Sequence, residues 1–217
     1  MKKLFIILVA CTVLHLGSYA QSPRIGFSAG VAISNLDFKA DNVSFSAKTK
    51  TGFTAGVVAD LPLGTNFSIQ PGLYYVRTGT TDEETEGGQT ASIDMSINNL
   101  ELPVNFLFNA HTTAGTFFIG AGPAISYALS GKGTASDGTN STSEDLHFGN
   151  SEGDDMKRLG IGANFTTGFT FKPGLLLAVN YNAGLSNLLP QATDNNKIKS
   201  HYFGIRLGYM FGGTGKK

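Results

Sequence analysis

The sequence predicts an all-β fold, an eight-stranded antiparallel up-and-down transmembrane β-barrel, and three observations support that prediction. Eight segments of about ten residues alternate apolar with small polar side chains, which is the two-residue period of a β-strand. The connections between these segments alternate between short and long. Charged residues make up 15% of the chain, whereas an ordinary soluble domain has roughly 25%.

Each of the eight segments places its apolar side chains on one face of a strand. The segments occupy residues 25–34, 53–61, 67–75, 100–108, 117–129, 159–171, 175–185 and 201–211. A tilted strand of about 9–11 residues crosses a bilayer, and bacterial barrels usually contain an even number of strands. The segments therefore have the length and the number that a small closed barrel requires.

The connections indicate how the strands are arranged across the membrane. Short connections lie at 62–65, 110–115 and 172–174, and long ones at roughly 37–51, 78–98, 130–157 and 186–199. In transmembrane barrels of this kind the tight turns face the periplasm and the long loops face the outside. Ile93, Met95 and Ile97 have the opposite parity to Leu100, so we expect a bulge or an end of strand pairing near Asn98–Asn99.

The positions of the charges identify the face that meets lipid. The apolar face of the eight segments carries no Asp, Glu, Lys or Arg. The opposite face carries five charged residues: Arg24, Asp60, Glu101, Arg158 and Arg206. Because a Lys or Arg facing lipid at the bilayer midplane costs about 2–4 kcal/mol, we expect the apolar face to point outward. A soluble lipocalin-like barrel is the alternative, but its outer face would be rich in charged residues.

The inward face contains many glycines, which would make room for larger groups such as Tyr74 and Tyr202. The interior of an eight-stranded barrel is just wide enough to be filled by side chains, so we expect a packed lumen and not an open pore. Aromatic residues near the strand ends are expected to form two girdles at the membrane interfaces. These residues are Phe67, Tyr75, Phe106, Phe108, Phe117, Tyr127, Phe169, Phe171, Tyr209 and Phe211, with Phe203 near the long-loop end.

Residues 1–20 are predicted to be a cleaved signal peptide, and residues 21–217 the outer-membrane β-barrel domain. Two lysines precede an apolar core at 4–16, and small residues at Ser18 and Ala20 suit cleavage before Gln21. The core is shorter than the roughly 20 residues of a membrane-spanning helix. A lipoprotein signal ending at Cys11 is a second alternative. Removal of Cys11 with the signal leaves a mature chain without disulfides or thiol chemistry.

Several strand motifs resemble the porin-family outer-membrane β-barrel domain, the group that includes PorT-like proteins and small OmpA/OmpX-type barrels. The motifs lie at 20–21, 25–30, 53–56, 100–104, 118–123 and 203–211. The resemblance implies location in the cell outer membrane, contact with outer-membrane lipid and lipopolysaccharide, and insertion by the barrel-assembly machinery. PorT-like members are associated with protein secretion machinery, although no residue here identifies that role. The aromatic ending at Phe211 resembles an assembly signal, from which the chain departs by continuing to Lys217.

Catalytic and cofactor chemistry is not predicted. The four histidines form neither a Ser/His/Asp arrangement nor a metal-ligand spacing, so we expect no enzyme, no metal and no cofactor. The formal net charge of zero gives no reason to expect a nucleic-acid partner. Acidic stretches at 82–86 and 137–155 are expected to be solvated loops; the alternative is that they bind divalent cations bridging lipopolysaccharide.

Glu101 and Arg206 are the most notable charged pair, since both should point into the barrel. They form either an internal salt bridge that fixes the packing, which we favour, or a gate or proton path. Arg24 and Asp60 are expected to lie near the periplasmic rim in a structural role. Two functions remain open: a structural or surface-interaction role for a packed barrel with long extracellular loops, contacting an unidentified envelope or extracellular protein, and small-solute transport through the lumen.

Overall fold

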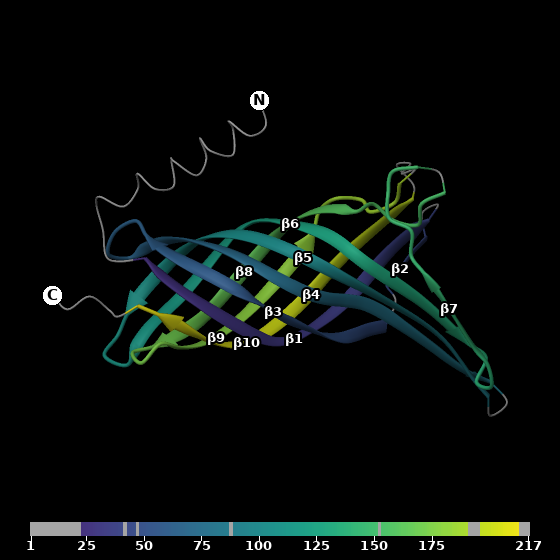
Figure 1. Cartoon of the computed structure of the whole chain (residues 1–217), viewed down its shortest axis with the longest axis horizontal. Helices are drawn as coiled ribbons and strands as arrows, with labels where there is room; N and C mark the ends of the chain where they lie inside the picture. Colours follow the sequence, from purple (N-terminus) through teal and green to yellow (C-terminus); the bar gives the residue numbers. More distant parts are fainter. Residues whose placement is uncertain are drawn as a thin grey trace.

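Eight long strands form a closed antiparallel barrel in a computed structural model that describes residues 23–40, 43–46, 48–86, 89–151, 153–190 and 196–212 (Figure 1). These strands are β1 (Arg24–Ala40), β3 (Lys48–Pro62), β4 (Phe67–Glu86), β5 (Gln89–His111), β6 (Gly115–Ser136), β8 (Leu159–Phe171), β9 (Leu175–Gly184) and β10 (Lys197–Phe211). Each pairs with the next of these strands along the chain, and β1 pairs with β10 to close the barrel. The predicted fold class is confirmed.

Two short strands lie outside the barrel wall. β2 (Val43–Ser46) pairs with the end of β1, and β7 (Ser141–Asp145) pairs with the end of β6. Among the described residues, no helix is long and apolar enough to span a membrane. The predicted signal peptide, residues 1–20, lies outside the part of the chain that the structure describes.

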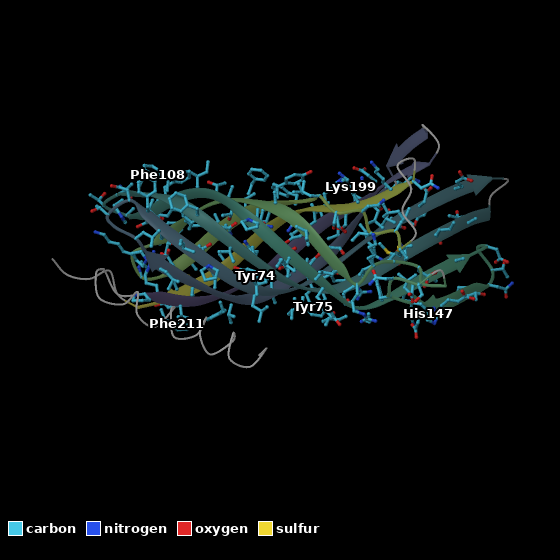
Figure 2. All side chains as sticks on the ribbon, turned by 90° about the horizontal axis from the view of Figure 1, so that it is seen from above. Tyr74, Tyr75, Phe108, His147, Lys199 and Phe211 are labelled. Carbon is cyan, nitrogen blue, oxygen red and sulfur yellow. The ribbon has the colours of Figure 1, made fainter. Side chains whose placement is uncertain are left out.

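Side-chain exposure alternates along the barrel strands with the apolar residues outside. On β10, Ile205 and Leu207 are 43% and 58% exposed, whereas Arg206 between them is 5% exposed. The soluble lipocalin-like alternative is therefore wrong, because it requires the large apolar side chains to line the interior. Figure 2 shows Phe108 and Phe211 at one end of the barrel, and His147 and Lys199 at the other. We call these the short-turn end and the long-loop end.

The interior of the barrel is filled by side chains from the inward face. An apolar cluster includes Val58, Tyr74, Leu107, Phe118, Leu176 and Met210. A Cβ atom added at Gly72 would lie 2.5 Å from the ring of Tyr74. Glycine at this inward position therefore makes room for a larger neighbour, which is the role that the sequence predicted.

The strand register shifts at the position that the parity change predicted. Between β5 and β6, Asn98 pairs with Ser130 but Asn99 pairs with Ala128, so the extra residue is Leu129 of β6. Pairing between β4 and β5 continues across the same residues without a shift. Ile97 is consequently an inward residue, 4% exposed, and packs with Ala128 and Met156.

The long connections are shorter than predicted, because the strands continue past their apolar segments. Most of the predicted loop 78–98 is a hairpin of β4 and β5, and β6 reaches Ser136 before β7 turns back along it. Beyond the barrel, residues 82–86 of β4, 89–95 of β5, 132–136 of β6 and all of β7 form a four-stranded sheet (Figure 1). We call it the projecting sheet. Its polar strands need no apolar alternation outside lipid, so the sequence pattern did not reveal them.

Three prolines interrupt the hydrogen-bond ladder at one region of the wall. Regular pairing lapses for two residue pairs between β3 and β4, between β4 and β5, and between β5 and β6. Each gap includes a proline: Pro71, Pro103 or Pro123. In antiparallel pairs, every second residue pair is hydrogen-bonded. Thr112 and Gly115 form one such pair of β5 and β6, since Thr112 N donates to Gly115 O. In the same register, Val104 and Pro123 therefore occupy a hydrogen-bonded pair. Proline has no N–H, so the carbonyl of Val104 loses a donor.

Replacing Pro123 by Val is expected to restore that donor and to slow local amide exchange. One hydrogen bond is worth about 1 kcal/mol, or roughly a fivefold change in an opening equilibrium. Hydrogen exchange of the amides of Leu102 and Asn105, measured in detergent micelles, should slow by about this factor. Amides of the uninterrupted β8–β9 seam, which serve as the control, should not change; unchanged exchange at Leu102 and Asn105 would contradict the assignment.

Candidate functional site in the barrel lumen

The centre of the lumen contains two charged residues from different strands, each in contact with a tyrosine. Glu101 of β5 and Arg206 of β10 are 4% and 5% exposed. The hydroxyl of Tyr202 donates to Oε1 of Glu101 at 2.7 Å. The guanidinium carbon of Arg206 lies 4.2 Å from the centre of the Tyr74 ring, a cation–π distance. The two predicted inward charges are therefore brought together, but the ion pairs found among the described residues do not include a direct one between them.

An asparagine chain crosses the lumen on the short-turn side of this group. Nδ2 of Asn164 donates to Oδ1 of Asn105 at 2.9 Å, and Nδ2 of Asn180 donates to Oδ1 of Asn164 at 3.4 Å. These residues come from β5, β8 and β9, and β5 does not neighbour β8 in the sheet. The sequence analysis did not single out these asparagines. The available signal was that all three have inward parity on their strands.

A cavity lies between the central group and the long-loop end. Its volume is about 50 Å³, and its walls include Glu101, Tyr202 and Asn182. Polar side chains of Thr78, Asn99, Ser126 and Ser200 also face it. One water needs roughly 10–15 Å³ of such space, so the cavity has room for only a few water-sized groups. We call it the lumen cavity.

A cap that contains an apolar cluster covers the lumen cavity at the long-loop end. It consists of residues 146–158, of which the structure does not describe 152, and 186–190. Met156 is 3% exposed and packs with Ile97 and Ala128, and Phe148 and Leu188 pack against this cluster. Backbone hydrogen bonds join the two parts of the cap and attach them to β10, from Lys157 N to Leu188 O at 2.7 Å and from Leu188 N to Ile198 O at 2.9 Å.

Arg158, one of the residues predicted for the inward face, attaches the cap to the barrel rim. Its guanidinium donates to the carbonyl oxygens of Ala128 and Phe148, both at 3.2 Å. The guanidinium carbon lies 5.7 Å from the ring centres of Tyr127 and of Phe148. Arg158 directly precedes β8, which begins at Leu159, and it also lines the lumen cavity.

Arg24 and Asp60 form an ion pair at the short-turn end of the barrel. Nη2 of Arg24 lies 2.5 Å from Oδ2 of Asp60, and the Asp60 side chain is 4% exposed. The two residues are direct partners in the β1–β3 register. The pair therefore joins neighbouring strands at the place where the sequence predicted the periplasmic rim.

The aromatic residues predicted to form girdles lie on the outer face. Near the short-turn end, Phe67 stacks on Phe106 with ring centres 5.4 Å apart, and Tyr209 meets Phe211 at 5.2 Å. Toward the long-loop end, Tyr75 stacks on Phe53 at 5.4 Å, while its neighbour Tyr74 points into the lumen. Phe108, Phe117, Tyr127, Phe169, Phe171 and Phe203 also lie on this outer face. Phe53 was not among the residues predicted for the girdles.

Acidic side chains at the long-loop end, among them Asp82, Glu144 and Asp155, are solvent-exposed. Asp137 accepts backbone hydrogen bonds from Asn140 at 2.6 Å and Thr139 at 2.8 Å, and these bonds lower the pKa of its carboxyl group. Lys48 pairs with Asp82, and Lys50 with Asp94. In the described ranges, no group of three or more His, Cys, Asp or Glu side chains is arranged to hold a metal ion.

A closed antiparallel barrel with large apolar side chains outside and charges inside is an integral membrane β-barrel. The chain belongs to the family described as outer membrane protein beta-barrel domain, which matches residues 19–190. The protein accordingly lies in the outer membrane, where its apolar outer face contacts lipid. No curated protein sequence matches the chain.

Solved structures of other small outer-membrane proteins are similar to the chain. The attachment invasion locus protein Ail of Yersinia pestis is 17% identical, with a TM-score of 0.44, and the match covers 88% of this chain and 100% of Ail. Neisserial surface protein A is 12% identical, with a TM-score of 0.45 and coverages of 88% and 100%. OprG of Pseudomonas aeruginosa is 14% identical, with a TM-score of 0.46 and coverages of 88% and 97%.

Proposed function

We propose that the protein is a packed outer-membrane barrel that presents its projecting sheet to a partner outside the cell. The observation that carries this proposal is the projecting sheet itself, in which β4, β5 and β6 continue beyond the lipid-facing wall and β7 adds a fourth strand. The proposal places the short-turn end in the periplasm and the long-loop end outside the cell, as in barrels with tight periplasmic turns.

The lumen supports a structural role more than a conducting one. The apolar cluster around Leu107 and Phe118 and the asparagine chain fill the short-turn half. The cap covers the other end, and the space between them is about 50 Å³. A solute would have to displace side chains at both ends in order to cross.

The free edge of the projecting sheet suits an extended partner. Asp137 N donates to Asn140 O, and Leu146 N donates to Gly131 O. The backbone N–H and C=O groups of the even-numbered residues of β7 therefore point toward β6. The backbone groups of Ser141, Ser143 and Asp145 therefore point away from the sheet, and no strand of the described chain pairs with that edge. Exposed edges of this kind accept an added strand. Glu144 and Asp145 beside the edge favour a partner with basic side chains.

Site-specific crosslinking in intact cells tests this role. A photo-crosslinking residue at Ser143 in β7 is expected to form a discrete adduct, which mass spectrometry would identify. The matched control carries the same residue at Thr65, in the turn between β3 and β4 at the short-turn end. Equal adducts at both positions, or none at Ser143, would contradict a surface-contact role for the projecting sheet.

Small-solute transport is the second candidate function, supported by the charged group in the lumen. Planar-bilayer recordings separate the two functions. We expect electrical silence from the intact protein, because both ends of the lumen are closed. Steady channels that Glu101→Ala abolishes or alters would instead establish transport. If the intact protein and Glu101→Ala refold to the same yield and neither forms channels, the packed barrel is supported.

Further assignments belong to the same proposal. We propose that residues 1–20 are removed as a signal peptide, that the barrel-assembly machinery inserts residues 21–217, and that lipopolysaccharide surrounds the outer half. The outward aromatic residues would anchor the two interfaces. We also propose that the protein is not an enzyme and needs no cofactor. The PorT-like subgroup is supported only by the strand motifs, and a role in secretion machinery has no support from individual residues.

A further inference from the structure

A row of polar side chains crosses the outer wall of the barrel just beyond its lipid-facing residues. Arg77 of β4 pairs in register with Asn98 of β5, which pairs with Ser130 of β6. We call these three residues the donor row. Two residues closer to the short-turn end, Tyr75 pairs with Leu100 on the same face. Because tyrosine marks the membrane interface and a strand rises about 3.3 Å per residue, the donor row lies at the level of the lipid headgroups.

The donor row has hydrogen-bond donors that the protein leaves unused. In the part of the chain that the structure describes, no ion pair includes Arg77. Its guanidinium donates to Oγ of Ser96, from Nη2 at 3.3 Å, and its other N–H groups have no acceptor there. The hydroxyl of Ser130 accepts from Nδ2 of Asn98 at 3.0 Å, so its own proton can be donated outward. Arg77 and Ser130 are both exposed.

The charge around the donor row is positive. On the donor row and the next two residue pairs beyond it, the outward acidic side chains of β3 to β7 are Asp94 and Asp145. Lys50 forms an ion pair with Asp94, and Lys132 lies opposite Asp145 in the register. Each carboxylate thus has a basic neighbour, and Arg77 is a further cation. This part of the wall therefore attracts an anion.

The wall on the membrane side of the donor row is apolar. Leu100 and Leu129 are 38% and 45% exposed, and Tyr127 is 45% exposed. A molecule that contacts both parts of the wall has an anionic group joined to hydrocarbon. Phosphate suits the donor row because it has several strong acceptor oxygens and because guanidinium binds it through paired N–H groups.

We propose that the donor row binds a phosphate group of an outer-leaflet lipid, whose acyl chains lie along Leu100 and Leu129. Arg77 supplies the charge and paired N–H donors, and Ser130 supplies a hydroxyl donor. The inference rests on one part of the proposed function, the placement of the long-loop end outside the cell. It does not depend on a partner of the projecting sheet.

Titration with lipid A, a phosphorylated glycolipid, tests the site by nuclear magnetic resonance of the refolded protein in dodecyl maltoside micelles. Saturable shifts are expected at the amides of Arg77, Asn98 and Ser130. Arg77→Gln should weaken binding roughly tenfold, because a hydrogen bond to a charged group is lost. Arg77→Lys should weaken it less, since lysine keeps the charge but not the paired donors. The matched control, Lys172→Gln in the exposed turn at the short-turn end, should leave binding unchanged.

Three outcomes would overturn the site. Equal binding of dephosphorylated lipid A would exclude the phosphate, and equal saturation by inorganic phosphate would indicate a site for the free anion. Full binding by Arg77→Gln would place the lipid elsewhere. Ser130→Ala is a second variant should Arg77→Gln fail to fold, and it should weaken binding roughly fivefold; full binding by it would also reject the donor row. Crosslinking at Ser143 tests the proposed surface role separately, so either proposal can fail without the other.

Discussion

Replacing Ile205 by Arg is expected to lower the free energy of unfolding by about 2–4 kcal/mol, the cost of a basic residue facing lipid near the bilayer midplane. Ile205 is 43% exposed on the outer face of β10. It lies on β10 between Phe203 and Tyr209, which we expect near the two membrane interfaces. Denaturant unfolding in lipid vesicles, followed by tyrosine fluorescence, measures the change.

The matched control for this prediction places the same substitution outside the bilayer. Ile93 is 64% exposed in the projecting sheet, so Ile93→Arg should change the unfolding free energy by no more than about 0.5 kcal/mol. A similar loss at both positions would mean that the cost arises from strand propensity. In that case the outer face of β10 at Ile205 would not lie in lipid.

Replacing Arg206 by Met is expected to destabilise the barrel by about 3 kcal/mol, because removal of one buried charge leaves the other uncompensated. Arg206 stacks on Tyr74, and Glu101 bonds to Tyr202 in the same part of the lumen. Met preserves much of the apolar stem of Arg but supplies no positive charge. The same vesicle-based unfolding experiment measures the loss.

A double variant distinguishes charge from packing in this result. Arg206→Met with Glu101→Gln should recover part of the lost stability, since no uncompensated charge remains. Lys132→Met, on the exposed part of β6, serves as the control and should have little effect. Additive losses in the double variant would show that the two charges do not stabilise each other, and would reject the structural explanation of the pair.

The strands that cross the lipid were predictable because their pattern is local. The predicted segment at 159–171 coincides with β8, and the segment at 175–185 exceeds β9 by one residue. Lipid excludes charge from one face of each such strand, so every second residue carries the signal. The register shift near Asn98 falls where the apolar side chains of β5 change parity, although the extra residue, Leu129, lies in β6.

The strand extensions were not predictable from the same pattern. Residues 82–86 of β4 and the whole of β7 are polar on both faces, and no lipid imposes alternation on them. They form strands because neighbouring strands continue beside them and offer backbone partners. The cap was missed for a related reason, since its apolar residues are separated in the sequence and meet only over the barrel mouth.

The inward placement of Glu101 and Arg206 was determined by the sequence, but their partners were not. Tyr202 and Glu101 are 101 residues apart, and their hydrogen bond depends on how the closed barrel positions β10 across the lumen from β5. The sequence by itself determined which side chains face lipid and which face inward, because strand alternation and the cost of charge in lipid act residue by residue. Only the tertiary structure decided which inward groups meet, where the cavity lies and how the cap covers it, because these depend on register and closure among strands far apart in the chain.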